Sequence, residues 1–184
     1  MSLNLLNTFA QIGTFVVIAA TAIAAMIQLR HLGQSNKLQA ILALRAERNN
    51  SVIDDAFAFV SDELHEKLND PVFRSDLENN ATPSRKLHKE LSLADYYEHV
   101  GVYLRKNLID EDIYFEIANP GRYWKVIEPA IALYRRKRGN RAFDNFEYLV
   151  LREREWNRTH PDGAFSEGQL RLEIADPYLD ADGG

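Results

Sequence analysis

Residues 9–29 read FAQIGTFVVIAATAIAAMIQL, a nearly continuous apolar run that sets the organisation of the whole chain. A helix needs about 20 mostly apolar residues to cross the hydrocarbon core of a bilayer. No charged side chain precedes Arg30, and the polar residues of the run are hydroxyls, which bond back to their own helix, or glutamines near its ends. The run therefore predicts a single N-terminal transmembrane helix.

Two other interpretations of this run are open from the sequence alone. Ala22, Ile23 and Ala24 resemble the cleavage site of a secretory signal peptide, but no Lys or Arg precedes the run as such a peptide requires. A helix buried inside a soluble domain is the third interpretation. We favour the anchor, because the run has the length of a bilayer span and its N-terminal flank lacks positive charge.

The first cations of the chain lie after the run, at Arg30, Lys37, Arg45 and Arg48, whereas residues 1–8 contribute only the terminal amine. Positive charge accumulates on the cytoplasmic side of membrane spans. We therefore expect a single-pass protein of the cell inner membrane whose C-terminal domain lies in the cytoplasm. The absence of cysteine is compatible with that reducing compartment.

About 155 residues follow the anchor, which is enough for one compact domain. The formal charge of the chain is -5, and residues 159–184 hold six acidic residues against one arginine. Residues 30–158 are therefore close to neutral, which argues against nucleic acid as a partner. We divide the chain into an anchor at residues 1–29, a cytoplasmic domain at 30–158 and an acidic tail at 159–184 that we expect to be mobile.

Apolar residues at three- and four-residue steps predict an all-α bundle for the domain. The patterns favour helices over residues 30–69, 83–107, 123–138 and 142–157, with short helices after Asp70 and Asp110. Asn49, Asn50 and Ser51 predict a bend or a break in the first of these helices. Pro129 predicts a kink or a restart in the third, because proline removes a backbone donor.

The apolar stripe of residues 38–68 has two possible uses. It resembles a coiled-coil seam, but Arg45 and Asn49 interrupt it, so we expect it to pack on its own domain. Gly101 lies on the apolar face of the second predicted helix. The missing side chain at this position allows another helix to approach closely.

Two stretches of the domain are informative together: YYEHVG at residues 96–101, followed by LIDED at 108–112, and a later segment that runs from Trp124 to NFEYL at 145–149. Over residues 38–156 they resemble a bacterial family of small helical proteins, domain of unknown function 4760, whose members often carry one N-terminal membrane helix. The resemblance implies an all-helical domain. It brings no known activity, cofactor or catalytic residue to this chain.

The five histidines do not form a metal site by their spacing. Asp95 and His99 share a helix face, with His88 two turns before Asp95, whereas zinc needs three or four convergent ligands. We therefore expect a polar stripe here, with no metal and no cofactor.

Glu98 and Glu147 are different, because each lies among large apolar residues. A carboxylate buried without a partner is costly, so we expect each to meet a cation in a structural ion pair. The candidate cations are Arg105, Arg135 and Arg152. Acid–base chemistry with shifted pKa values is the alternative.

Arg154 and His160 are separated by five residues. This spacing resembles the arginine-then-histidine motif of the helical nucleotide-binding RNase superfamily, in which the pair acts on RNA across a dimer. Pro161 follows the histidine and biases it away from helix, so the two side chains need not converge.

The densest cluster of positive charge lies at the end of a predicted helix and comprises Arg135, Arg136, Lys137, Arg138 and Arg141. Cations at a helix C-terminus complement the macrodipole, which makes a solvated helix end the first interpretation. Contact with anionic lipid is the second, because the domain is tethered beside a negative leaflet. Nucleic acid is the third and least favoured.

The membrane helix contains two pairs of small residues at four-residue spacing, Ala20 with Ala24 and Thr21 with Ala25. Such pairs let two helices approach closely, which favours self-association or docking on another membrane protein. Alanine is also common in spanning helices that have no partner.

Together these features predict a membrane-anchored helical interaction or accessory module of unknown pathway at the cytoplasmic face of a bacterial-type membrane. The bilayer is its expected partner. The alternative is a membrane-tethered hydrolase directed at RNA or nucleotides that uses Arg154 and His160.

Overall fold

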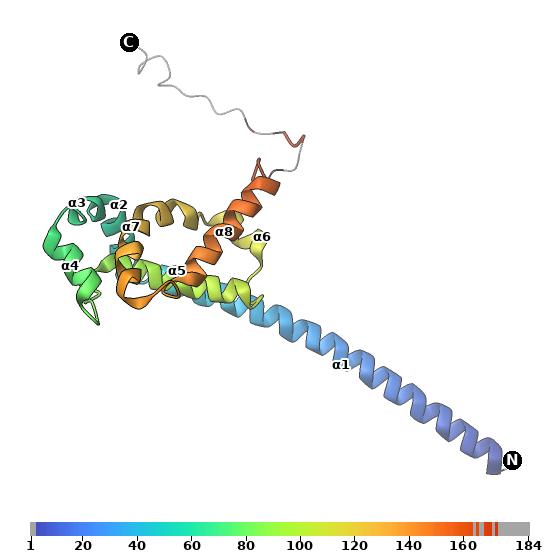
Figure 1. Ribbon diagram of the computed structural model, residues 1–184. Coiled ribbons are helices and arrows are strands. Elements are labelled where there is room, and N and C mark those ends of the chain that lie inside the picture. Colours follow the sequence, from blue (N-terminus) through green and yellow to red (C-terminus); the bar gives the residue numbers. More distant parts are fainter. Residues whose placement is uncertain (1–2, 164, 166–167, 171, 173–184) are drawn as a thin grey trace.

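The computed structural model describes residues 3–163, 165, 168–170 and 172 (Figure 1). All regular secondary structure in this part of the chain is helical, which confirms the predicted all-α fold. The helices are α1 (Leu3–Arg48), α2 (Ser51–Asp62), α3 (Leu64–Lys67), α4 (Pro71–Asn79), α5 (Lys89–Arg105), α6 (Glu111–Ile117), α7 (Pro120–Arg138) and α8 (Asp144–Thr159). Most of the expected acidic tail, at residues 159–184, lies outside the described residues.

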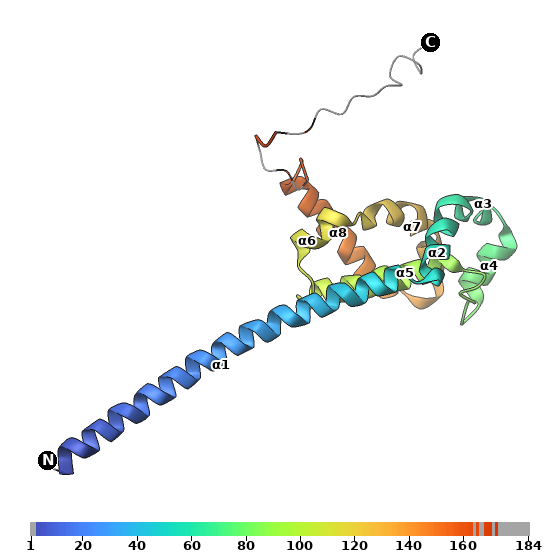
Figure 2. The same cartoon turned by 180° about the vertical axis from the view of Figure 1, so that it is seen from behind.

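α1 is one helix of 46 residues that runs from the predicted anchor into the domain. Figures 1 and 2 show its N-terminal part projecting from the bundle as a rod, with its last turns beside the other helices. Its most apolar segment is not buried by the rest of the described chain, whereas Leu44 near its C-terminal end is only 6% exposed. The protein thus has one N-terminal apolar helix long enough to span a membrane, and this segment is not a core helix of the domain.

The chain turns between α1 and α2, as the polar residues 49–51 predict. The side chain of Asn50 caps α2 by accepting the N–H of Val52 at 2.9 Å. Asp70 caps α4 in the same way, through the N–H of Val72 at 2.8 Å. Because side-chain oxygens satisfy the free N–H groups of a helix start, both helix starts follow from local chemistry.

α5 begins at Lys89 rather than at residue 83, so the predicted start of this helix is wrong. The Ser84 carbonyl accepts the N–H groups of Leu87 and His88 in a preceding turn. These bonds satisfy the backbone of the segment without a helix.

α7 continues through Pro129, so the alternative of a helix restart is wrong. The carbonyl that proline leaves without a donor belongs to Lys125, and both residues are exposed. The missing hydrogen bond therefore lies on the exposed side of the helix.

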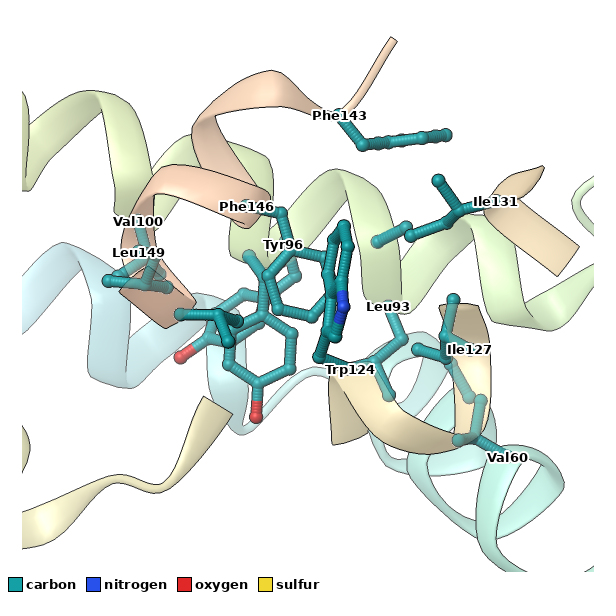
Figure 3. Close-up of a cluster of buried hydrophobic side chains, with 14 of the residues drawn as sticks. Val60, Leu93, Tyr96, Val100, Trp124, Ile127, Ile131, Phe143, Phe146 and Leu149 are labelled. Atoms are coloured by element: carbon teal, nitrogen blue, oxygen red, sulfur yellow. The ribbon is translucent and has the colours of Figure 1, made fainter. Parts of the chain in front are cut away.

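Aromatic side chains from α5, α7 and α8 form the centre of the core (Figure 3), and α2 adds the buried rings of Phe57 and Phe59. The ring of Trp124 meets the ring of Phe146 edge-on, with the two centroids 4.9 Å apart. Phe146 also stacks on Tyr97 at a centroid distance of 4.7 Å. Edge-on and stacked ring pairs add to the stabilisation that burial of their area provides. This cluster joins the three longest helices of the domain after α1.

α5 and α8 approach closely at Gly101. A Cβ atom at this position would lie 2.1 Å from the carbonyl oxygen of Asn145 and 2.6 Å from its carbonyl carbon. Near the same crossing, Glu98 of α5 accepts the N–H of Phe146 at 2.8 Å and the side-chain amide of Asn145 at 2.6 Å. The glycine and the carboxylate together hold the first turn of α8 against α5.

Gly101→Ala is expected to lower the free energy of unfolding by about 1–3 kcal/mol, as an oversized side chain does in a packed core. The atoms in its way belong to the backbone of α8, so the helices must move apart. Urea-induced unfolding of the full chain in detergent, followed by circular dichroism, measures this change.

Gly33→Ala is the matched control, because Gly33 is also helical and a Cβ atom there would meet nothing within 4 Å. It should be neutral or stabilise the protein by up to about 1 kcal/mol, since alanine favours helix. Wild-type stability of Gly101→Ala would show that the fold does not need this close approach.

Candidate functional site

A cavity of about 520 Å³ lies where the last turns of α1 meet α2, α5, α6 and α7. Its volume falls within the range of about 300–1,000 Å³ that is usual for small-molecule sites. Five helices contribute to its walls, so its shape depends on the packing of the whole domain. We call it the junction cavity, because it lies at the junction of the projecting helix with the domain.

One wall of the junction cavity is aromatic. Phe57 of α2 meets Tyr123 of α7 edge-on at a centroid distance of 4.7 Å, and Tyr96 lies 5.1 Å from Tyr97 within α5. The aliphatic part of the lining consists of Ile41, Leu44, Ile109, Ile113, Ile117 and Ala118. Most of the surface that a ligand would meet is therefore apolar.

Tyr114 of α6 also lines the junction cavity, and its hydroxyl is buried without a hydrogen-bond partner among the described residues. Burial raises the pKa of this phenol well above its ordinary value, so it stays protonated and remains a donor. A buried donor without an acceptor destabilises the fold. Tyr114 therefore contributes its ring to the cavity wall, while its hydroxyl lies inside the protein.

Three arginines of the lining place positive charge at the cavity: Arg45 and Arg48 from α1 and Arg122 from α7. Arg48 is already engaged, because it pairs with Asp54 and its guanidinium lies 3.9 Å from the centroid of the Phe57 ring. The other two are exposed and take part in no ion pair among the described residues. Their exposure places them where the cavity opens to solvent.

Asp110 is the one acidic residue of the lining among the described residues, and its Oδ2 atom lies 3.9 Å from the Nζ atom of Lys37. This pair offsets the acidic charge with a cation from α1. The opening of the junction cavity therefore keeps an excess of positive charge.

α8 holds the α6 wall of the cavity in place. Arg152 forms a bidentate pair with Glu111, with its Nη2 atom 2.8 and 2.9 Å from the two carboxylate oxygens. One turn further along α8, the indole N–H of Trp156 donates to Asp112 at 3.0 Å. Bidentate pairs fix orientation as well as distance, so α6 is anchored at its first turn.

A second polar cluster lies between α4 and the start of α5. The ring of His88 is fully buried, with Nδ1 2.9 Å from Glu90 and Nε2 2.8 Å from Asp76. Phe73 covers the imidazole at a centroid distance of 4.4 Å. The imidazole thus joins a buried carboxylate to a partly exposed one.

Burial alone would lower the pKa of His88, but the hydrogen bond and charge of Glu90 and then those of Asp76 outweigh it and raise the pKa above the ordinary value. The hydrogen bond from His88 lowers the pKa of Asp76, and a second bond from Asn80 adds to this effect. The cluster therefore favours a protonated imidazole between two carboxylates. Its chemistry is that of a structural ion cluster.

The two glutamates predicted to form ion pairs have different partners. Glu147 lies 2.8 Å from the Nη2 atom of Arg135, one of the predicted cations. Glu98 forms no ion pair among the described residues and binds the Phe146 N–H and the Asn145 amide instead. A helix start supplies N–H donors and positive potential, so it replaces the expected arginine at this carboxylate.

Glu153 performs the same task for α7, and the sequence analysis missed it. Its carboxylate, only 5% exposed, accepts the N–H of Gly121 in the first turn of α7. Burial raises the pKa of Glu153, and the bond from the Gly121 N–H opposes that rise. This carboxylate is the polar link between α8 and the start of α7.

The basic cluster at the end of α7 is largely engaged within the protein. Arg136 pairs with Glu78 at 3.0 Å, and Arg138 donates to carbonyl groups at the end of α4 and lies 3.9 Å from the centroid of the Tyr134 ring. Lys137 and Arg141 are exposed. Contact of the cluster with anionic lipid stays a prediction.

Arg154 and His160 are not brought together by any interaction among the described residues. The imidazole of His160 stacks on the ring of Trp156, with centroids 4.5 Å apart, and its Nδ1 atom lies 3.1 Å from the Trp156 carbonyl oxygen. Arg154 is exposed on α8. This geometry does not support the hydrolase alternative.

The small residues of the predicted anchor lie on the projecting part of α1. Ala20, Thr21, Ala24 and Ala25 are exposed, and the Thr21 hydroxyl donates to the carbonyl of Val17 at 2.8 Å. Their role in helix association stays a prediction. Over the part of the chain that the structure describes, no group of three or more His, Asp or Glu side chains is placed to hold a metal ion.

The family model described as "Domain of unknown function (DUF4760)" matches residues 15–153. This chain belongs to that family. The match confirms the resemblance carried by residues 96–101 and 145–149. It begins inside the apolar part of α1 and ends in α8, so the DUF4760 match includes α1 from residue 15 onward and the whole lining of the junction cavity. No curated protein and no solved structure matches the chain.

The sequence carried only partial signals of these sites. Arg45 interrupts the apolar stripe of residues 38–68, and in the structure this arginine lines the junction cavity. His88 was expected on a polar stripe with Asp95 and His99, yet Asp95 pairs with Arg85 and His99 contacts Glu47. In the DUF4760 domain, His88 instead binds Asp76 of α4 and Glu90, which lies two positions after it in the sequence.

Stability of the wild-type domain should fall as the pH rises above about 6.5, the ordinary pKa of histidine. A raised pKa in the folded state means that the contribution of charged His88 is complete below this value and is lost as the pH rises through the folded-state pKa. Asp76→Asn removes one of the groups that raise this pKa, so the loss should occur at lower pH. Thermal unfolding of the full chain across about pH 5–9 measures the shift.

Asp62→Asn is the matched control, because Asp62 is exposed on the neighbouring helix α2. It removes the same charge and should leave the pH profile unchanged. Profiles of Asp76→Asn and wild type that run parallel would show that this carboxylate does not tune His88.

Proposed function

We propose that this DUF4760 protein is a membrane-anchored interaction module, with its domain at the cytoplasmic face of a bacterial-type inner membrane. The supporting observation is the continuity of α1: its exposed apolar part projects from the bundle, and its last turns are built into the domain core. An apolar helix that its own domain leaves uncovered needs another apolar environment. A bilayer provides one that matches its length.

The dimensions of α1 are consistent with a domain that lies close to the membrane surface in this proposal. Residues 9–29 cover about 30 Å at 1.5 Å per residue, the thickness of the hydrocarbon core. Residues 30–36 are exposed and add about 10 Å before the ion pair between Lys37 and Asp110 links α1 to the domain. The helix therefore acts as a short stalk that presents the domain at a defined height.

The cytoplasmic orientation rests on the distribution of charge. Arg30, Lys37, Arg45 and Arg48 all follow the apolar run, and positive charge remains on the cytoplasmic side. The small residues of the anchor offer a surface for a second copy or another membrane protein. In this proposal the anchor places the module, and the domain surface presents contacts to a partner.

The full chain should remain with the membrane pellet after carbonate extraction, and external protease should spare a tag placed after Gly184 in spheroplasts. Val16→Arg combined with Ile23→Arg should release the protein, because each charge at the centre of a span costs about 2.5–3.5 kcal/mol. Leu38→Arg combined with Leu42→Arg is the control, since these residues are 58% and 55% exposed and lie after the run.

Extraction of the wild-type chain by carbonate would contradict the anchor. Cleavage of the C-terminal tag in intact spheroplasts would contradict the orientation while leaving the anchor in place. The two parts of the proposal are therefore tested separately.

A further inference from the structure

We propose that the junction cavity is a binding site for an organic anion with an apolar body. The apolar part of the ligand packs against the aromatic wall of the cavity, and its anionic group lies at Arg45 and Arg122. The DUF4760 match assigns no ligand to this site. The inference does not depend on the orientation of the protein in the membrane.

The lining selects an apolar body. Phe57, Tyr96, Tyr97 and Tyr123 present ring faces and edges, and isoleucines from α1 and α6 complete the surface. Burial of apolar ligand surface against such walls is the main source of affinity in small-molecule sites. A small hydrophilic anion such as phosphate would gain little from this part of the cavity.

The opening selects a negative charge. Arg45 and Arg122 come from different helices, line the same cavity and take part in no ion pair among the described residues. Guanidinium groups match carboxylate, phosphate and sulfonate oxygens with paired donors. Arg48 adds little to this charge, because Asp54 already pairs with it.

The position of the cavity links its occupant to the anchor. Ile41, Leu44 and Arg45 belong to the same helix as the apolar run, whereas the opposite wall belongs to α6 and α7. A ligand in the cavity therefore contacts both the projecting helix and the domain. Amphiphilic anions also accumulate at membrane surfaces. In the proposed arrangement, the membrane surface lies near this end of the domain.

The experiment uses the full chain in phosphatidylcholine nanodiscs and two fluorescent probes of matched shape. Anilinonaphthalenesulfonate carries an aromatic body and a sulfonate, and phenylnaphthylamine carries the same body without the charge. Empty nanodiscs provide the blank for each titration. We expect saturable binding of one sulfonate probe per chain, at least about tenfold tighter than binding of the neutral probe.

Arg45→Gln combined with Arg122→Gln should weaken binding of the sulfonate probe at least about tenfold and leave the neutral probe unaffected. Lys67→Gln combined with Lys86→Gln is the matched control, because both lysines are exposed outside the cavity lining. Ile113→Trp fills the cavity from a residue that is 51% exposed, so it should weaken both probes without disturbing the core. Circular dichroism melts verify that each variant is folded.

Competition identifies the source of the anion. Displacement of the sulfonate probe by octanoate added in solution indicates a soluble organic anion. Displacement by phosphatidylglycerol included in the nanodisc indicates a membrane lipid. Empty nanodiscs of each lipid composition provide the blank. Either result supports the site. Equal affinity for the two probes, identical behaviour of the arginine and lysine variants, or displacement by neither competitor would overturn the proposal.

Discussion

The contact between α5 and α8 at Gly101 governs how the helices of this domain are arranged. Since no side chain separates the two backbones there, Glu98 reaches the backbone N–H of Phe146 and the side-chain amide of Asn145 in the first turn of α8. A negative charge at this point is stabilised by the helix dipole as well as by the hydrogen bonds. The same placement inserts Phe146 between Tyr97 and Trp124, so one close approach organises both the polar and the apolar parts of the core.

α8 then positions α6 and α7 through charged side chains. Arg152 holds the first turn of α6, Glu153 caps the first turn of α7, and Glu147 binds Arg135 near the end of α7. α6 and α7 form walls of the junction cavity, to which α8 contributes no lining residue. The positions of two walls of the candidate site therefore depend on a helix that does not line it.

α1 has two roles that depend on its being one continuous helix. In the proposed arrangement its apolar part lies in a bilayer, and its last turns bury Leu44 and supply Arg45 to the cavity. The apolar segment and the junction cavity are thus connected by one continuous helix, and Lys37 and Asp110 link this helix to the segment before α6.

The features that depend on neighbouring residues follow from the sequence alone: the apolar helix, the break at residues 49–51, the helix start after Asp70 and the all-helical fold. The sites follow only from the packed structure. His88 is buried because α4 brings Asp76 to it, and Arg122 shares a cavity with Arg45 because α1 and α7 meet the same aromatic cluster. Periodicity defines which face of a helix is apolar, whereas the crossing of helices defines which distant charges share that face.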